Sequence, residues 1–427
     1  MTSTNDTQHA NNKRHVLAGT VGNILEWYDF AIYGFLAPVI SPLFFPDDNA
    51  MAGLIKTYGV FAAGYLMRPI GGVIFGHIGD RMGRKKALQL SIAMMAIPTV
   101  LVGLLPVYAQ IGTWAAVLLI VLRLLQGISV GGELIGSMSY LVETAPPNRR
   151  GWQGSWSVCG GVAGILLGSL VATLLNNSVS QPVMNSWGWR LPFLFGVVIF
   201  AAGRWLRRTL IESPDFVSSQ DTPDAHGTPL AAVLRDMPLR VLHMSANILL
   251  FATSFYTLFV WMPTYLTTMV SPPVGHALLV NTIAMSLLLV WIPASGRLSD
   301  TFGRTKVILT VTAILGVMVY PLFLFVDHGS TGIALMVQVV FSILVGSIQG
   351  PLPAYLVESF PARNRYTAIG LSYNITLAIF GGTAPLVCTW LISATGNLAS
   401  PAIYLAVLAA ISFVSMLLFK QTETTSI

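Results

Sequence analysis

Charged residues are scarce in this chain of 427 residues. Asp, Glu, Lys and Arg make up 9% of it, whereas an average soluble domain contains about 25%. So few charges cannot cover the surface of a water-soluble protein of this size, since apolar residues in the broad sense make up 54%. The composition therefore disfavours a cytosolic enzyme, a disordered protein and a nucleic-acid binder. It favours a polytopic membrane protein, whose apolar surface contacts lipid.

Cysteines and familiar catalytic patterns are also scarce. The two cysteines, Cys159 and Cys388, lie inside apolar runs, so neither a disulfide framework nor a cysteine metal site is indicated. The sequence contains no His-Glu-x-x-His pattern and no P-loop. We therefore expect neither an enzyme nor an ATP-driven pump, and we expect no metal or other cofactor.

Long apolar runs fill most of the chain. No short apolar run near the start ends in a small-residue cleavage site, so we interpret the first run as a membrane span and not as a signal peptide. In hydrocarbon every backbone amide must be satisfied within the segment, so the runs are predicted to be α-helices. This predicts an all-α polytopic membrane protein with twelve transmembrane helices, at about residues 16–40, 52–77, 87–107, 114–142, 152–176, 189–208, 241–268, 277–296, 307–326, 332–357, 366–393 and 398–419.

The basic residues alternate along the chain. All but four of the 23 Lys and Arg lie in the tails, in the even-numbered connections between spans or beside them. Because cytoplasmic loops carry the excess of Lys and Arg, both termini are predicted to lie in the cytoplasm. A nucleic-acid-binding protein would instead gather its cations on one surface, so no nucleic-acid partner is expected.

One long polar segment, rich in Ser, Pro and Asp, separates the sixth and seventh spans. We interpret it as a cytoplasmic linker between two six-helix bundles. The predicted organisation is a cytoplasmic N-terminal tail, an N-terminal bundle, the linker, a C-terminal bundle and a cytoplasmic C-terminal tail, at residues 1–15, 16–208, 209–240, 241–419 and 420–427.

Two motifs occur twice, in the same order and at nearly the same offset. Residues 76–86 read Gly-His-Ile-Gly-Asp-Arg-Met-Gly-Arg-Lys-Lys, and residues 296–306 read Gly-Arg-Leu-Ser-Asp-Thr-Phe-Gly-Arg-Thr-Lys. Tyr-Leu-Val-Glu at 140–143 is repeated at 355–358. Such a repeat indicates two related six-helix halves in parallel orientation, an arrangement typical of one large class of transporters.

These loops resemble the signature of the major facilitator superfamily, which follows the second span as Gly-x-x-x-Asp-Arg-x-Gly-Arg. A second signature of that family, Arg-x-x-Gln-Gly, is matched by Arg123, Gln126 and Gly127 in the fourth span. Four further stretches are similar to its metabolite:proton symporter branch, which contains bacterial proline/betaine, 2-oxoglutarate, citrate and shikimate transporters; they are residues 22–30, 67–72, 131–133 and 187–193.

The resemblance covers about residues 16–420 and implies a function. It implies secondary active import of a small metabolite by proton symport with alternating access, in the bacterial inner membrane, with the lipid bilayer, protons and the substrate as partners. We expect a monomer. An uncoupled facilitator or an exporter with the same fold is the alternative, and in that case the buried carboxylates are structural.

The substrate is predicted to carry a carboxylate. Arg68, Arg123 and Lys56 suit such a group. An organic acid fits, and so does a zwitterion such as proline or betaine, whose cation can be held by Trp27 or Trp261. Some osmosensory proline/betaine transporters have a long coiled coil after the last span, and only a short tail follows it here, which slightly favours the organic acid.

Five ionisable residues lie well inside predicted spans, namely Glu26, Asp29, Arg68, Arg123 and Glu133. Each Asp or Arg costs about 2.5–3.5 kcal/mol at a helix centre, so the five are expected to face protein or water and to pair. At about 1.5 Å per residue, Glu26, Arg68 and Glu133 occupy one layer, so Arg68 is expected to pair with one of these glutamates. We expect Glu26, Asp29 or Glu133, beside Arg123, to bind and release the coupled proton. Permanent ion pairs that only fix helix packing are the alternative.

The predicted spans 7 to 12 contain no Asp, Glu, Lys or Arg. The second half is therefore expected to offer neutral polar and aromatic groups to the substrate. An aromatic stretch at 251–265 can line the pocket, although such a stripe more often faces lipid or the core. The predicted substrate-binding residues are Arg68, Trp27, Tyr256, Gln338, Tyr373 and Asn374.

The loops that resemble the family signature are predicted to form a gate on the cytoplasmic side of the protein. In family members the Asp of the first loop caps a neighbouring helix and bonds a basic partner when the protein is open outward. The resemblance therefore assigns gating roles to Asp80, Arg81, Gly83 and Arg84, with weaker twins in Asp300 and Arg304. Two further pairs are expected to add to the closure because a negative charge near Arg and a helix N-terminus is favourable; they are Glu143 with Arg150 and Glu358 with Arg365.

Overall fold

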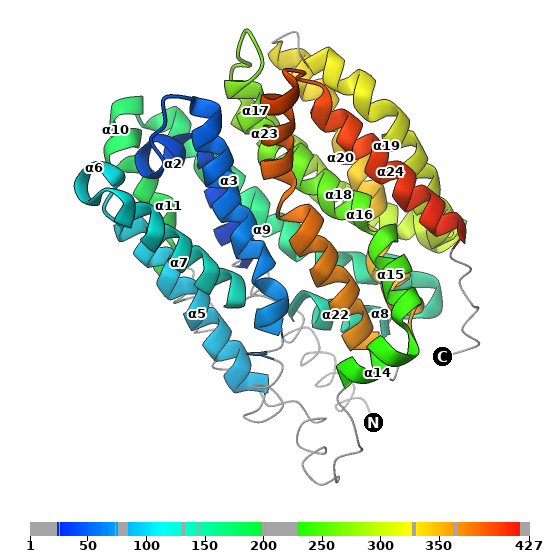
Figure 1. Ribbon diagram of the computed structural model, residues 1–427. Coiled ribbons are helices and arrows are strands. Elements are labelled where there is room, and N and C mark those ends of the chain that lie inside the picture. Colours follow the sequence, from blue (N-terminus) through cyan, green and yellow to red (C-terminus); the bar gives the residue numbers. More distant parts are fainter. Residues whose placement is uncertain are drawn as a thin grey trace, which may run out of the picture.

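The structure is a computed structural model of the chain (Figure 1). It describes residues 24, 26–72, 74–75, 84–129, 133–143, 145–198, 201, 229–326, 330–361 and 365–418. For residues 84–89, 91–92, 133 and 229–232 it describes the backbone and not the side chains.

All regular elements in these ranges are helices. Nine of them are long and apolar enough to cross a membrane, at Ala50–Gly72, Thr113–Glu143, Pro147–Ser178, Pro238–Thr268, Ala277–Phe302, Arg304–Val326, Thr331–Glu358, Arg365–Thr395 and Ser400–Leu418. The first, third and sixth predicted spans are also helical in their described parts, which are residues 26–44, Ala93–Leu104 and Gly188–Val198. The structure thus has a helix at the position of each predicted span.

The elements before the polar linker are α2 (Ala37–Phe44), α3 (Ala50–Leu66), α5 (Arg84–Leu104), α6 (Tyr108–Ile111), α7 (Thr113–Ser129), α8 (Glu133–Glu143), α9 (Arg150–Ser178), α10 (Gln181–Ser186) and α11 (Leu191–Leu194). Those after it are α14 (Pro229–Asp236), α15 (Pro238–Asn247), α16 (Leu249–Phe255), α17 (Met262–Thr268), α18 (Ala277–Phe302), α19 (Arg304–Val326), α20 (Thr331–Gln349), α21 (Leu352–Glu358), α22 (Arg365–Thr376), α23 (Ala384–Thr395) and α24 (Ser400–Leu418).

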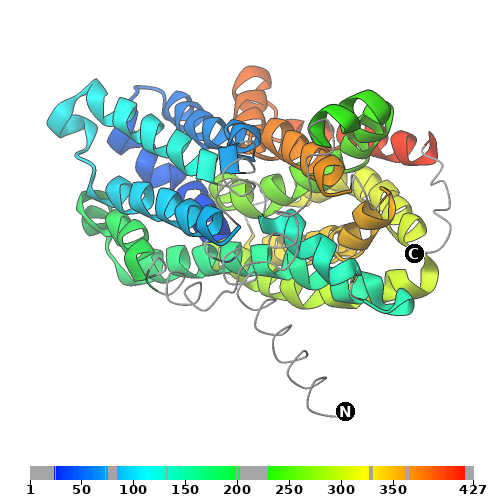
Figure 2. The same cartoon turned by 90° about the horizontal axis from the view of Figure 1, so that it is seen from below.

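The helices stand roughly side by side, with α5, α6 and α7 at one edge of Figure 1 and α19 and α24 at the other. Helices α9 and α18 pack against each other between these groups, as the view from below also indicates (Figure 2). They run in opposite directions, because Gly151 of α9 meets Gly296 of α18 whereas Ser169 meets Thr282. This antiparallel pair joins the two halves of the sequence along most of its length.

The crossing of α3 and α7 depends on glycine. A Cβ atom on Gly127 would lie 1.9 Å from the carbonyl oxygen of Gly64, and one on Gly71 would lie 1.9 Å from the carbonyl oxygen of Ile128. No side chain fits at such distances, so the two backbones are in direct contact. Small residues allow this kind of approach between membrane helices. The contact fixes Arg123, one turn before Gly127, against the first helix.

Two spans of the second half contain a π-helical segment. Residues Tyr256–Trp261 separate α16 from α17, and Leu377–Gly381 separate α22 from α23. Segments of this kind often occur at functional sites. The two segments are neighbours, since a Cβ atom on Gly381 would lie 3.1 Å from the ring of Tyr256. The aromatic side chains of the stretch 251–265 are all buried, so the stripe faces the interior of the protein and not lipid.

Replacing Gly127 by Ala should destabilise the protein, because the new methyl group overlaps the Gly64 carbonyl oxygen. Overpacking of this kind costs about 1–3 kcal/mol. Gly59→Ala is the matched control, since nothing lies within 4 Å of a Cβ there and alanine is the better helix former. The thermal unfolding midpoint of the purified protein in detergent should fall for Gly127→Ala and stay or rise for Gly59→Ala. Equal midpoints would contradict the close crossing.

Candidate functional site

A small cavity lies between the two halves of the sequence. Its volume is about 30 Å³, well below the roughly 300–1,000 Å³ of pockets that hold a small-molecule ligand. The first half contributes Trp27 and residues of α8 and α9, and the second half contributes residues of α16, α20, α22 and the π-helical segments. The side chains that give the lining its character are Trp27, Phe251, Phe255, Tyr256, Tyr373 and Gln349. The remaining lining residues are aliphatic or glycine, so the cavity is apolar, with five aromatic rings and one amide.

An ion pair is buried beside this cavity. The Arg68 Nη2 atom lies 3.3 Å from the Glu26 Oε1 atom, and both side chains are almost fully buried. Of the two partners expected for Arg68, the described one is thus Glu26. The Arg68 guanidinium also lies 5.3 Å from the ring centre of Trp27 and 5.4 Å from that of Tyr65, at cation–π distance. Its Nε and Nη1 atoms have no hydrogen-bond partner among the described residues.

Asp29 and Arg123 are connected through two neutral side chains. The Arg123 Nη1 donates to Gln126 Oε1 at 2.9 Å, and Gln126 Nε2 donates to Thr99 Oγ1 at 2.6 Å. Thr99 Oγ1 in turn donates to Asp29 Oδ2 at 2.5 Å. All four side chains are buried. The two residues predicted to act in proton coupling therefore belong to one hydrogen-bonded chain, although they do not pair directly.

Aromatic rings supply the rest of the surroundings of Arg123. Its guanidinium lies 4.4 Å from the ring centre of Tyr33 and 5.0 Å from that of Phe30. Its Nε and Nη2 atoms have no hydrogen-bond partner among the described residues. The faces of aromatic rings attract a cation most strongly where water is excluded. They therefore stabilise a buried guanidinium that has no carboxylate in contact.

The structure divides the predicted substrate-binding residues into two groups. Trp27, Tyr256 and Tyr373 line the cavity, and Arg68 lies beside it. Gln338 does not line it, because its Nε2 donates to the Leu258 carbonyl at 3.1 Å and so supports the π-helical segment of the seventh span. Asn374 is buried but is not part of the lining either.

Two further polar residues lie near the centre: Gln349, one of the neutral polar groups that the sequence offers in the second half, and Thr99, which sequence reasoning missed. Gln349 ends α20 and lines the cavity, with its Oε1 buried and without a hydrogen-bond partner among the described residues. Thr99 joins Asp29 to Gln126. A signal for Thr99 is visible in hindsight, since it is the one polar side chain between residues 93 and 105.

Lys56 and Trp261 are remote from the cavity lining. The Lys56 ammonium is 2.7 Å from Asp47 Oδ2, and the Lys56 side chain is 52% exposed. The hydrogen bond from Lys56, with a second from the backbone N–H of Asn49, lowers the pKa of Asp47 below its ordinary value. The indole N–H of Trp261 donates to Thr389 at 2.9 Å. Neither residue is placed to hold a substrate in the cavity.

Asp300 holds one end of the contact between the halves. Its Oδ1 and Oδ2 accept hydrogen bonds from the backbone N–H groups of Gly151 and Trp152, at 2.8 and 3.0 Å, at the start of α9. Arg304 also bonds Asp300, at 3.2 Å. A carboxylate at a helix N-terminus satisfies N–H groups that have no partner within the helix. Asp300 therefore makes the contacts that the family pattern implies for Asp80.

The glutamates of the repeated motif contact arginines of both halves. Arg365 Nη1 lies 2.7 Å from Glu143 Oε1, across the halves. Glu358 lies 2.9 Å from Arg304 of its own half and 3.9 Å from Arg150 of the other. The expected partners, Arg150 for Glu143 and Arg365 for Glu358, are thus exchanged in the ion pairs that cross between the halves, because each glutamate ends a helix that meets the opposite half. Asp80, Arg81 and Gly83 lie outside the described residues, as do the side chains of Arg84 and Glu133.

Hydrogen bonds between neutral groups join the halves on the other side of the cavity. Tyr58 donates to Thr264 at 2.8 Å, and Tyr256 donates to Tyr65 at 2.9 Å. On the α9–α18 contact, the Ser169 and Thr282 hydroxyls are 2.8 Å apart. The described conformation is therefore bridged both at the Asp300 end and at the Tyr58 end.

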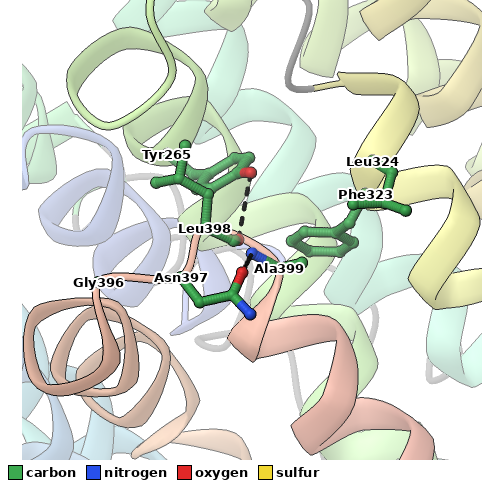
Figure 3. A pocket seen from close by; sticks show the side chains of 7 residues that line it. All are labelled: Tyr265, Phe323, Leu324, Gly396, Asn397, Leu398 and Ala399. Carbon is green, nitrogen blue, oxygen red and sulfur yellow. Dashed lines mark hydrogen bonds between the residues drawn. The ribbon is translucent and has the colours of Figure 1, made fainter.

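A larger pocket of about 390 Å³ lies near the Tyr58 end of the second half (Figure 3). It is lined by Tyr265, Phe323, Leu324, Gly396, Asn397, Leu398 and Ala399. Two hydrogen bonds are drawn there, from the Tyr265 hydroxyl to the Leu398 carbonyl and from the Ala399 N–H to Asn397. These lining residues include no charged side chain.

Comparison with known proteins identifies the family. The model of the Major Facilitator Superfamily matches residues 20–375 and 270–426. The chain therefore belongs to this superfamily, and it is a multi-pass membrane transporter and not an enzyme. The predicted all-α transporter fold and the family resemblance are both confirmed.

Among curated proteins, the chain is 32% identical over 419 residues to the glycine betaine/proline/ectoine/pipecolic acid transporter OusA of Dickeya dadantii (strain 3937), covering 96% of this chain and 83% of that protein. It is equally identical to the proline/betaine transporter of Escherichia coli (strain K12), over 96% and 84% of the two chains. Among solved structures, the xylose transporter XylE from E. coli in a partially occluded inward-open conformation has a TM-score of 0.78 at 20% identity, covering 96% of this chain and 98% of that one. The last likeness shows the shared fold.

Replacing Asp300 by Ala should loosen the start of α9, because the Gly151 and Trp152 N–H groups lose their acceptor. A hydrogen bond to a charged group contributes about 1.5–3 kcal/mol, so amide exchange in residues 150–156 should accelerate about tenfold or more. Hydrogen–deuterium exchange with mass spectrometry measures this. The control is Asp236→Ala, which removes the carboxylate of an exposed pair with Arg235. Unchanged exchange in Asp300→Ala would remove the capping role.

Proposed function

We propose that this chain imports a small zwitterionic metabolite of the proline/betaine type by proton symport with alternating access. The observation that carries the proposal is the buried chain from Arg123 through Gln126 and Thr99 to Asp29, next to an aromatic cavity with its own buried ion pair. The curated relatives named above add support, since they are named as transporters of proline and betaine.

Asp29 is the proposed carrier of the proton. Its Oδ2 is held by Thr99, and its Oδ1 has no hydrogen-bond partner among the described residues. A buried carboxylate with one occupied oxygen and one open oxygen can gain a proton without first breaking an ion pair. Glu26 is a weaker candidate because it already pairs with Arg68. Glu133 stays a candidate from its sequence position.

Arg68 is the proposed anchor for the substrate carboxylate. Its Nε and Nη1 atoms are the donors left over from the pair with Glu26, and a guanidinium makes strong, charge-assisted hydrogen bonds to carboxylates. The cationic nitrogen of a zwitterion would then lie among Trp27, Tyr256 and Tyr373, whose ring faces attract a cation. This combination favours a zwitterion over a purely anionic organic acid.

Alternating access is supported by the two sets of bridges. The Asp300 end closes by ion pairs and the Tyr58 end by hydrogen bonds between neutral groups. The cavity of about 30 Å³ is too small for proline or betaine, so we propose that one set of bridges opens to admit a substrate. We propose that the Asp300 end, rich in arginine, faces the cytoplasm, in agreement with the positive-inside rule.

Purified protein in liposomes tests the function. With the outside more acidic than the lumen, radiolabelled proline and glycine betaine should accumulate inside the liposomes above the outside concentration. A protonophore should abolish the accumulation. Citrate and 2-oxoglutarate serve as the organic-acid comparison. Uptake that only equilibrates, with no effect of the gradient, would indicate an uncoupled facilitator; accumulation of the organic acids alone would overturn the substrate class.

Asp29→Asn should separate binding from coupling. The variant keeps the size of the side chain but carries no exchangeable carboxyl proton, so exchange of labelled for unlabelled proline should persist while gradient-driven accumulation falls by about tenfold or more. Glu26→Gln and Glu133→Gln are the comparison variants. Retained accumulation in Asp29→Asn would exclude it as the proton carrier, and loss in Glu133→Gln alone would move the role there.

Arg68→Lys should weaken the substrate site while leaving coupling intact. Lysine keeps the charge but cannot present two parallel donors. We expect the KM for proline to rise by about tenfold, which corresponds to about 1.4 kcal/mol, with little change in the maximal rate. Uptake kinetics in the same liposomes measure both. A fall in the maximal rate at constant KM would speak against substrate contact.

A further inference from the structure

The Thr99 hydroxyl has more neighbours than one hydrogen atom can serve. Its oxygen lies 2.5 Å from Asp29 Oδ2 and 2.9 Å from the Met95 carbonyl oxygen, and it accepts from Gln126 Nε2 at 2.6 Å. A hydroxyl has one hydrogen to donate and two lone pairs to accept. The hydrogen of Thr99 therefore points either at the carboxyl group or at the carbonyl one turn earlier in α5. We infer that Thr99 is a positioning residue that switches between these two acceptors as Asp29 loses and gains its proton.

The ionised state fits one orientation. A charged carboxylate accepts hydrogen bonds more strongly than a backbone carbonyl does. The Thr99 hydrogen then points at Asp29 Oδ2, and Gln126 donates to the Thr99 oxygen. In this orientation the donors run in one direction, from Arg123 to Asp29, and each step supports the negative charge at the end.

The protonated state fits the other orientation. The incoming proton forms an O–H bond at the open Oδ1 of Asp29, and no other bond breaks. A half-turn of the carboxyl group, whose last torsion is nearly two-fold, places this O–H against the Thr99 oxygen. The Thr99 hydrogen turns to the Met95 carbonyl, and the oxygen now accepts from both Asp29 and Gln126. In both states the Thr99 hydrogen has an acceptor and one oxygen of Asp29 is bonded to Thr99, without movement of a helix.

The other ionisable groups around Asp29 are already engaged. Arg123 of α7 and Tyr28, the residue before Asp29 in the first helix, interact with Asp29 electrostatically, and the Tyr28 hydroxyl donates to the Pro192 carbonyl in α11 at 3.0 Å. Glu26, three residues earlier, pairs with Arg68 of the second span. The other titratable hydroxyls close to Arg123 are those of Tyr33 and Tyr65. Thr99 is therefore the described hydroxyl that contacts the Asp29 carboxyl directly.

A purely structural role for Thr99 is the competing explanation. Thr99 follows Pro98, which interrupts the hydrogen bonding of α5, and its bond to the Met95 carbonyl is common for a threonine inside a helix. Such a role would affect stability but not the pH dependence of transport. The pH profile therefore separates the two explanations.

The inference rests on the proposed proton symport and is tested on the full-length protein in liposomes. Initial uptake of proline is measured against pH for the wild type and for Thr99→Val, Thr99→Ala and Thr99→Ser. Removing the donor to the ionised carboxylate should move the pH of half-maximal uptake upward by about one unit or more in the Val and Ala variants. Thr99→Ser keeps the hydroxyl and should keep the wild-type profile. Thr389→Val, which removes a buried hydroxyl that accepts from Trp261, should leave the profile unmoved.

The outcomes separate a failure of the proposed proton symport from a failure of the Thr99 inference. If the wild type shows no proton-linked uptake, the proposed function is wrong, and Thr99 has no titrating carboxyl group to position. A coupled wild type whose profile is matched by Thr99→Val or Thr99→Ala overturns the inference alone. If both variants fail to fold while Thr99→Ser folds normally, the hydroxyl is needed for the structure of α5, and the inference is also overturned.

Discussion

The constraint on which this structure depends is that a charge inside a membrane protein must be matched within the protein. Unpaired, each such charge costs several kcal/mol, and the protein meets this cost in two ways. Arg68 has a carboxylate in contact, whereas Arg123 has aromatic faces and a hydrogen-bonded route to Asp29. The first arrangement neutralises charge permanently. The second leaves the Asp29 carboxylate free to change its charge, so the two arrangements suit different tasks.

The helix contacts serve the same constraint. Glycines allow α3 and α7 to touch, and this contact fixes both Arg68 and Arg123 against the first helix. Along α9 and α18 several of the residues in contact are small or hydroxylated, as with Gly151, Gly296 and Ser169. These positions can separate without unpacking a large side chain. Rigid charge placement inside each half and an easily parted contact between halves are what alternating access requires.

Much of this could be predicted from the sequence, and the remainder has physical reasons. The spans follow from apolar length, and the pairing of Arg68 with Glu26 or Glu133 follows from equal depth and the cost of an unpaired charge. The outlying position of Gln338 could not be predicted, because the helix that carries it is apolar on all sides and shows no preferred face. A buried Thr99 carries no obvious free-energy cost, because a threonine hydroxyl can donate to a carbonyl of its own helix. The crossed pairing of the glutamates depends on how the halves face each other, which a repeat alone does not specify.

That crossed pairing has a consequence for the solution on each side of the protein. At the Asp300 end every carboxylate of the closure is neutralised partly or wholly from the opposite half, so opening exposes several charges of both signs to water together. Dissolved ions screen such charges over about 8–10 Å at ordinary ionic strength, which weakens the closed state and favours the open one. The hydroxyl bridges at the Tyr58 end carry no net charge and respond far less. Under the proposed alternating access, the balance between the two openings would therefore depend in part on the salt concentration on one side of the membrane only.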